Sequence, residues 1–263
     1  MNILDRIVLR KKEEVILAKK LVSTQELESA THFGRATYSF ADFLQAPGRT
    51  GIIAEFKRKS PSKGLINGVS TVTEVTKGYS NAGASALSVL TDTDFFGGYA
   101  ADLLEARAAN EIPILRKDFM IDEYQLLEAK AWGADIILLI AAILTPGEVK
   151  QLAGFAKSLG LNVLLEVHNK EELERSICDD LDAIGVNNRN LGDFSVDIQT
   201  SFDLVNQIPG RFMKISESAI SEVNTIRELK NAGFNGFLVG ESFMKTDDPG
   251  AAMSAFATEL ISV

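Results

Sequence analysis

The chain has 263 residues, of which 46% are apolar and 24% charged, and its formal net charge at pH 7 is −9. This is an ordinary globular composition, and the acidic balance argues against a general nucleic-acid binder or a membrane-surface binder. Cys178 is the single cysteine, which excludes an intramolecular disulfide and a thiolate metal site.

The sequence contains no targeting or membrane signal. The first residues, 1–6, are charged early and lack the apolar core of a secretory signal peptide. The longest apolar run, 136–144, is too short to span a bilayer. We therefore expect a cytoplasmic protein in which Cys178 is a small buried thiol.

Residues 1–48 are predicted to be a helical extension of the domain that follows, because this segment is too small for a core of its own. Apolar spacing predicts an amphipathic helix over 3–20 and a short helix over 40–45, capped by Ser39. The expected apolar face of the first helix consists of Ile3, Ile7, Leu9, Val15 and Ile16. The side chains expected to lie mostly toward solvent are Lys11, Lys12, Glu13, Glu14, Lys19 and Lys20.

From residue 51 the chain alternates short apolar strands with helical segments. The expected strands are 51–57, 85–90, 112–117, 135–140, 162–167, 182–187, 211–216 and 236–240. The expected helices are 71–82, 98–109, 122–132, 146–159, 169–178, 198–207, 221–232 and 248–261. Helix starts are indicated by Thr71, Asp122, Thr145-Pro146 and Ser221.

Strand–helix units spaced by about 20 to 35 residues predict a parallel sheet. Eight such units predict an α/β fold of the (β/α)8 TIM-barrel type over 49–263, in one domain with its N-terminal extension. A doubly wound open sheet is the alternative, which we disfavour because no G-x-G-x-x-G follows the first strand.

Ionisable or amide side chains end five of the eight expected strands, at the rim where barrel active sites lie. They are Glu55, Lys57, Lys117, Glu166, Asn187, Arg189 and Glu217. Any one of them suits a solvated strand end, but together they crowd one mouth, which shifts pKa values toward acid–base chemistry near neutrality. Repulsion between the two lysines favours a lower lysine pKa and the three glutamates oppose it, so the sequence leaves the balance open.

The last two strand–helix turns differ from the others in having small residues at helix starts. They are Ser216–Ile220 and Val239–Ser242. Exposed backbone N–H groups in these turns are what a phosphate needs, and this is the usual phosphate position in a barrel. Tight turns without a ligand remain the alternative, and Lys57 or Ser60 would add contacts from the neighbouring first strand.

The fourth strand ends apolar, in Leu138–Ala142, and predicts a wall for an aromatic ring, together with Phe56, Phe119 and Leu191. Each of these residues alone also suits plain core. Trp132, His32 and His168 are expected to be structural. No His, Cys or carboxylate cluster has metal-ligand spacing, so we expect neither a metal nor another cofactor.

Seven motifs occur in order along nearly the whole chain. They are IIAEFKRKSPSKG (52–64), SVLTD (88–92) with FFGG (95–98), LRKDF (115–119), LEVH (165–168), GVNNRNL (185–191), ISES (215–218) and VGES (239–242). With these motifs the chain resembles the indole-3-glycerol phosphate synthase family of tryptophan biosynthesis. The first motif alone is a highly specific signature.

The resemblance implies a carboxy-lyase that acts on 1-(2-carboxyphenylamino)-1-deoxy-D-ribulose 5-phosphate. This substrate closes to indole-3-glycerol phosphate with loss of carbon dioxide and water, by general acid–base catalysis. It would require a phosphate site, a cationic grip for a carboxylate and an apolar slot for the phenyl ring. The resemblance implies no nucleic-acid or membrane partner; the oligomeric state stays open, with a monomer as the working expectation.

The resemblance also implies catalytic roles. Lys117 would protonate the ketone as the ring carbon attacks it, and Glu166 would transfer protons. Lys57 would hold the anionic substrate, and Glu55 would orient the lysines and the substrate amine. Whether Lys57 or Glu166 serves the dehydration step is left open.

The remaining implied roles concern orientation and binding. Asn187 and Glu217 would steer hydroxyl and amine groups. Arg189 and Ser60 would help with the anions, and Ser218, Gly240 and Glu241 would complete the sugar-phosphate end. The family usually has glycine where this chain has Ala219, and a Cβ there restricts the backbone. We therefore expect a modest loss of phosphate affinity and no loss of chemistry.

Two other functions were weighed. A sister phosphate-binding barrel, such as phosphoribosylanthranilate isomerase or the tryptophan synthase α chain, lacks the EFKRKS stretch and the counterpart of Lys117. A non-catalytic paralogue that senses phosphorylated ligands would not need three carboxylates facing an anion. Ligand binding without turnover would favour this second alternative.

Overall fold

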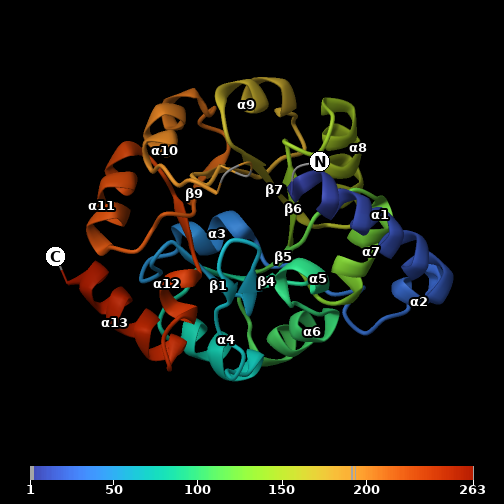
Figure 1. Cartoon of the computed structure of the whole chain (residues 1–263), viewed down its shortest axis with the longest axis horizontal. Helices are drawn as coiled ribbons and strands as arrows, with labels where there is room; N and C mark the ends of the chain where they lie inside the picture. Colours follow the sequence, from blue (N-terminus) through green and yellow to red (C-terminus); the bar gives the residue numbers. More distant parts are fainter. Residues whose placement is uncertain (1–2, 191, 193, 263) are drawn as a thin grey trace.

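The structure is a computed structural model, which describes residues 3–190, 192 and 194–262. In the described part of the chain, eight parallel strands close a barrel in the order β1-β10-β9-β8-β7-β6-β5-β4, surrounded by helices (Figure 1). The strands are β1 Ile52–Phe56, β4 Ala86–Leu90, β5 Ile114–Lys117, β6 Ile136–Ile140, β7 Asn162–Val167, β8 Ala183–Asn187, β9 Met213–Glu217 and β10 Gly236–Val239. The predicted TIM barrel is confirmed, and each strand lies within two residues of its expected range.

The barrel strands are apolar on both faces because each one contacts two different layers. In β6, Ile136, Leu138 and Ile140 belong to the inner core, whereas Ile137 and Leu139 pack in the core beneath the helices. Alternating side chains therefore fill the barrel and bind the outer helices at the same time.

The outer helices follow the expected order. They are α4 Val72–Asn81, α6 Ala100–Ala109, α7 Glu123–Ala131, α8 Pro146–Ser158, α9 Lys170–Ser176, α10 Gln199–Leu204 with the 3₁₀ turn Val205–Gln207, α11 Val223–Ala232 and α13 Pro249–Ile261. Thr71, Asp122 and Thr145 are N-caps as predicted, but the N-cap of α11 is Glu222 rather than Ser221. Three short helices were not expected: α2 Thr24–Glu28, α5 Thr93–Phe96 and α12 Glu241–Met244.

The N-terminal extension contacts both ends of the barrel. Helix α3 (Phe40–Gln45), capped by Ser39 as predicted, places Phe40 and Leu44 in the inner core with Ala86 and Ala183, which begin their strands. Helix α1 (Ile3–Leu21) places Ile7 in the same core beside residues at the opposite, carboxyl ends of the strands.

The predicted faces of α1 are partly wrong. Lys11, expected in solvent, is only 4% exposed, and its ammonium group lies 3.0 Å from Asp92 and 2.9 Å from Asp118. Leu9 and Ile16, expected in the apolar face, are 54% and 57% exposed. The helix turns its cationic side chain inward because the loops after β4 and β5 present two buried carboxylates there.

Two further expectations need correction. The loop after β1 contains a small antiparallel hairpin, β2 Lys59–Ser60 with β3 Gly64–Leu65, where only a turn was expected. Cys178 is partly rather than fully buried. Among the described residues, no helix is long and apolar enough to cross a membrane.

Candidate active site

A cavity opens at the carboxyl ends of the barrel strands and encloses about 930 Å³ of empty space, part of it open to solvent. All six expected catalytic residues line it: Glu55, Lys57, Lys117, Glu166, Asn187 and Glu217. Six of the expected binding residues line the same cavity: Ser60, Phe119, Leu138, Arg189, Ser218 and Glu241. An adjoining hollow, which shares Lys57 and Ser218 with this cavity, adds Ala219 and Gly240. The structure therefore brings the whole predicted set together.

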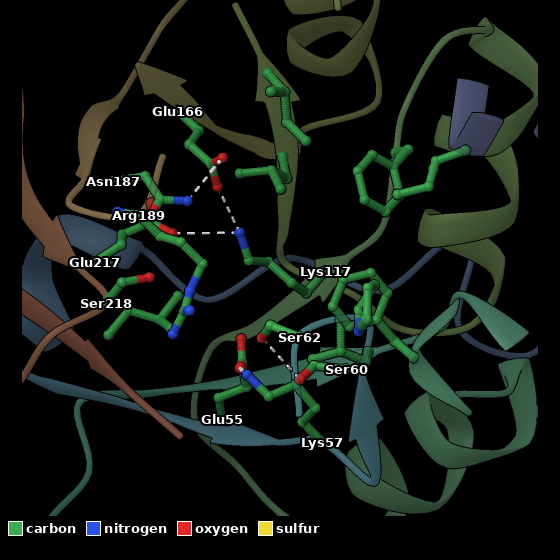
Figure 2. A pocket seen from close by; sticks show the side chains of 18 of the residues that line it. Glu55, Lys57, Ser60, Ser62, Lys117, Glu166, Asn187, Arg189, Glu217 and Ser218 are labelled. Atoms are coloured by element: carbon green, nitrogen blue, oxygen red, sulfur yellow. Dashed lines mark hydrogen bonds and ion pairs between the residues drawn. The ribbon is translucent and has the colours of Figure 1, made fainter. Parts of the chain in front are cut away.

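Lys117 lies between two carboxylates near the centre of the cavity (Figure 2). Its Nζ donates to Glu166 Oε2 at 2.7 Å and to Glu217 Oε2 at 3.3 Å. Burial alone would lower the pKa of Lys117, but Glu166, Glu217 and Glu55 more than offset it, so this pKa is raised. Lys117 is thus a cation at neutral pH. The glutamates outweigh the repulsion between Lys57 and Lys117, a balance that the sequence left open.

The two carboxylates around Lys117 differ in protonation. Burial would raise the pKa of Glu166, but Lys117, His168 and a hydrogen bond from Asn187 lower it to about 2. Burial raises the pKa of Glu217 to about 7, helped by Glu166 and Glu55 and opposed by Lys117. Carboxyls that share one cation titrate as a pair, and within this pair Glu217 is the group whose pKa is raised, so it keeps a proton to higher pH than Glu166 does.

Glu217 fits in the barrel because its neighbour has no side chain. A Cβ on Gly185 of β8 would lie 2.1 Å from Glu217 Oε1. The same oxygen is buried and has no hydrogen-bond partner among the described residues. An unpaired, desolvated oxygen at this position favours the protonated carboxyl and leaves it free for a substrate group.

Glu55 and Lys57 form a second ion pair across the cavity. Lys57 Nζ donates to Glu55 Oε1 at 2.7 Å, and Ser88 Oγ donates to Glu55 Oε2 at 3.3 Å. Gly240 allows this arrangement, since a Cβ there would lie 2.8 Å from Glu55 Oε1. Lys57 therefore lies on the side of the cavity that adjoins the last two strand–helix turns.

One wall of the cavity is apolar, as predicted. It contains Phe119, Leu138 and Ile140, and Phe96 packs on Phe119 with ring centroids 6.0 Å apart. Phe56 does not belong to this wall: it points outward from β1 and is buried in the core beneath the helices. Leu191, also expected here, lies outside the described residues.

The adjoining hollow has the small-residue lining predicted for a phosphate. Ser218–Ser221 and Val239–Ser242 border it, and the ammonium-bearing Lys63 and Lys245 lie at its margin. Ser218 and Ala219 adopt left-handed backbone conformations with φ of 67° and 60°. Such conformations are unfavourable for residues with a Cβ, so the turn is held in place by its surroundings.

Sequence reasoning missed several lining residues. Ile3, Leu4 and Ile7 of α1 close one side of the cavity; Ile3 and Ile7 were predicted only to pack in the apolar face, and Leu4 was not singled out. Phe96 was part of a quoted motif but received no role. His168, expected to be purely structural, lies with its Nε2 3.4 Å from Glu166 Oε1, and its position two residues after Glu166 was the signal available. Among the described residues, no group of three His, Cys, Asp or Glu side chains is arranged to hold a metal ion.

Comparison with known proteins gives a consistent family match. The family model described as indole-3-glycerol phosphate synthase matches residues 4–256. A protein of that name from Bacteroides thetaiotaomicron is 48% identical over 255 residues, covering 97% of each chain. One from Laribacter hongkongensis is 44% identical over 258 residues, covering 96% of this chain and 98% of its own.

Solved structures with a similar fold are more distant. A mutant tryptophan synthase α-subunit from Pyrococcus furiosus has a TM-score of 0.63 at 16% identity, covering 82% of this chain and 99% of its own. At this identity the likeness concerns the fold alone, and it agrees with the closed barrel described above.

Proposed function

The chain belongs to the indole-3-glycerol phosphate synthase family, and from this premise we propose how its side chains divide the reaction. The enzyme is a carboxy-lyase of tryptophan biosynthesis that closes 1-(2-carboxyphenylamino)-1-deoxy-D-ribulose 5-phosphate to indole-3-glycerol phosphate. The observation that carries the assignment of roles is the position of Lys117 between Glu166, whose pKa is lowered, and Glu217, whose pKa is raised.

Lys117 is proposed as the acid of the ring-closing step. The ring carbon that bears the carboxylate attacks the ketone carbon, and the ketone oxygen takes a proton from Lys117 Nζ. A cationic lysine stabilises the oxygen as negative charge develops on it. Glu166, 2.7 Å from Nζ, holds the ammonium in place before this transfer and, as a carboxylate, can accept a proton in a later step.

The carbon–carbon bond to the carboxylate next breaks, its electrons restore the aromatic ring, and neutral carbon dioxide leaves. In the last step the hydroxyl leaves as water after taking a proton, and a proton departs from the carbon beside nitrogen. The substrate enters as a carboxylate, so each turnover takes up one proton from solvent. Glu217, with a pKa of about 7, is suited to hold that proton. Lys57 is the candidate acid for the leaving hydroxyl and Glu166 the candidate base for the departing proton, and which of the two serves the dehydration step stays open.

The two ends of the cavity suit the two ends of this substrate. The wall of Phe119 and Leu138 is proposed to hold the phenyl ring. The hollow bordered by Ser218, Ala219, Gly240 and Glu241 is proposed to hold the phosphate, with Ser60 and Arg189 adding contacts to the anionic groups. Glu55 fixes Lys57 between them, and Asn187 is placed to orient a substrate hydroxyl or amine.

The test is to mix the purified protein with this substrate, with no added metal or cofactor, and to record indole fluorescence together with carbon dioxide release. Both signals are expected in a one-to-one ratio. Binding seen by calorimetry without either signal would support a phosphate-binding paralogue instead, and the family match does not favour that alternative. On the same premise we propose that the enzyme acts in the cytoplasm and that it is a monomer. Sedimentation of the purified protein tests the monomeric state.

A further inference from the structure

His168 lies directly behind Glu166, on the side away from Lys117. It follows β7 two residues after Glu166, and its side chain is only 12% exposed. Glu172 of α9 lies 3.1 Å from Nδ1 and also accepts the backbone N–H of His168 at 2.8 Å. The other ring nitrogen, Nε2, is buried, makes no hydrogen bond among the described residues and faces Glu166 Oε1 at 3.4 Å.

The surroundings of His168 favour a ring that carries protons on both nitrogens. A carboxylate only accepts, so Glu172 fixes a proton on Nδ1 and Glu166 favours one on Nε2. Burial would lower the pKa of His168, but Glu172, Glu166 and Glu217 more than offset it and raise this pKa above its usual 6.5. Two cations lie near this group: Lys117 is paired with the other oxygen of Glu166, and Arg189 lines the same hollow as His168.

We propose that His168, anchored by Glu172, is a positioning residue for Glu166. Its protonated ring places positive charge 3.4 Å from Oε1 of Glu166 and so keeps Oε2 turned toward Lys117, 2.7 Å away. Asn187 of β8 donates to Oε1 at 3.1 Å, so the carboxylate is held by His168 and by side chains from two other strands, β5 and β8. The inference deepens the proposed function, because it rests on the role assigned there to Glu166.

A second cavity connects His168 and Glu172 to solvent by a path separate from the cavity proposed for the substrate. His168, Asn169 and Glu172 line an open hollow of about 880 Å³, which Asn187 and Arg189 separate from the substrate cavity. His168 therefore exchanges protons with bulk water during turnover, and its titration is expected to be visible in the pH dependence of the complex as well as of the free enzyme.

The first test measures the titration of His168 without any turnover. The chain contains only two histidines, so the imidazole C–H signals in a proton NMR spectrum are assigned with His32→Asn and His168→Asn. His168 is expected to titrate above 6.5 and His32 below it, where burial lowers the pKa. Glu172→Gln is expected to lower the pKa of His168, whereas Glu171→Gln, the same change at an exposed neighbour on α9, leaves it unchanged. A His168 pKa insensitive to Glu172→Gln would overturn the proposal.

The second test separates positioning from a structural role. His168→Ala is expected to lower kcat roughly tenfold with KM within about twofold, since the effect acts on the reacting geometry. His168→Gln, whose amide donates from nearly the same place, is expected to restore most of this loss. The wild-type kcat is expected to fall as pH rises through the His168 pKa, and His168→Gln to lose this alkaline limb. His32→Asn is the matched control, expected to leave the profile unchanged.

The outcomes are distinguishable. If the normalised pH profiles of wild type and His168→Gln superimpose, or if His168→Ala retains full kcat, the positioning role is wrong while the proposed function stands. If the wild type itself gives no indole product, the proposed function fails first. If His168→Ala does not fold, Glu172→Gln replaces it. A shift of the alkaline limb of its kcat–pH profile to lower pH supports the positioning role, and an unshifted limb opposes it.

Discussion

Lys117 and its two carboxyls form a unit whose protonation cannot be assigned one residue at a time. Lys117 holds Glu166 ionised, and the charge of Glu166 in turn helps to keep the proton on Glu217. Because Glu217 titrates near 7, small changes around it alter how the site is charged at working pH. The position of this carboxyl also depends on Gly185. Any side chain at residue 185 would collide with Glu217 and displace its carboxyl.

The unusual residue in the turn proposed to bind phosphate, Ala219, gives a prediction for both binding and stability. Ala219 has a φ of 60°, which glycine adopts without strain. Ala219→Gly is expected to lower KM about two- to threefold with kcat unchanged, and to raise the free energy of unfolding by about 0.5–1 kcal/mol once the added freedom of the unfolded chain is subtracted.

Steady-state kinetics and urea unfolding check this prediction. Ala101→Gly, on the exposed face of α6, is the control: it is expected to destabilise by about 1 kcal/mol and to leave KM unchanged. An unchanged KM in Ala219→Gly would show that the Cβ does not narrow the phosphate site.

At the scale of elements, a buried cation of α1, Lys11, helps to hold this helix over the cavity. Lys11 lies between Asp92 and Asp118, while Ile3 and Ile7 of the same helix line the cavity. Lys11→Met removes the cation shared by two buried carboxylates, of which Asp118 keeps Arg116 as a partner, and is expected to destabilise by about 3–5 kcal/mol. It is also expected to raise KM, because α1 loses the contact that sets its position.

Lys12→Met is the matched control for this change, since the neighbouring Lys12 is exposed. It removes the same charge from the same helix and is expected to shift stability by less than about 0.5 kcal/mol. Equal effects of the two substitutions, measured by urea unfolding, would mean that the buried ion pairs do not anchor α1.

Most elements were predictable because the pattern of apolar residues reports directly on burial. Strands such as β7, buried on both faces, and helices with side-chain caps, such as α8 with Thr145, were found within a few residues. The orientation of α1 was not predictable. A lysine in an amphipathic helix is normally predicted to face solvent. Lys11 is buried because the fold brings Asp92 and Asp118, which are distant in sequence, next to it.

The same limit applies to the site. The grouping of the proposed catalytic side chains in one cavity was predictable because these residues end strands that must meet at one rim. The protonation of Glu217 was not, since it depends on burial and on two neighbours distant in sequence. The role of His168 was missed for a related reason: its anchor, Glu172, is supplied by the start of the next helix.

At the scale of the whole molecule, buried ionised carboxylates predict a loss of stability in acid. Two of them are Asp118, whose pKa burial would raise but Lys11 and Arg116 lower to about 2, and Glu166, lowered to about 2. Their stabilising contribution is complete above their unfolded pKa values near 4 and is lost as pH falls from about 4 to 2. Asp118 alone accounts for about 2 kcal/mol of this loss.

Glu217 changes the stability of the fold with pH in the opposite direction, because its pKa is raised in the folded state. Its neutral form is favoured in the folded state, so stability is expected to decline as pH rises from about 4.5 to 7. Urea unfolding between pH 2.5 and 8 checks both limbs. Glu217→Gln is expected to flatten the decline between pH 4.5 and 7, and a decline of the same size in that variant would assign it to other groups.

The expectation that residues 1–48 belong to the same domain as the barrel is a proposal at this scale. Phe40 and Leu44 of α3 and Ile7 of α1 lie in the inner core itself. We therefore expect one cooperative unfolding transition for the full chain, seen at the same urea concentration by circular dichroism and by Trp132 fluorescence.

The central claim is that Lys117 performs chemistry and does not merely bind the substrate. The most direct measurement compares kcat, and the dissociation constant of the substrate from calorimetry, for wild type and Lys117→Met. We expect kcat to fall at least about 1,000-fold while the dissociation constant changes less than about tenfold, because the hollow proposed for the phosphate and the apolar wall are untouched. A variant that keeps kcat within tenfold of the wild type, or loses binding as fully as turnover, would contradict it.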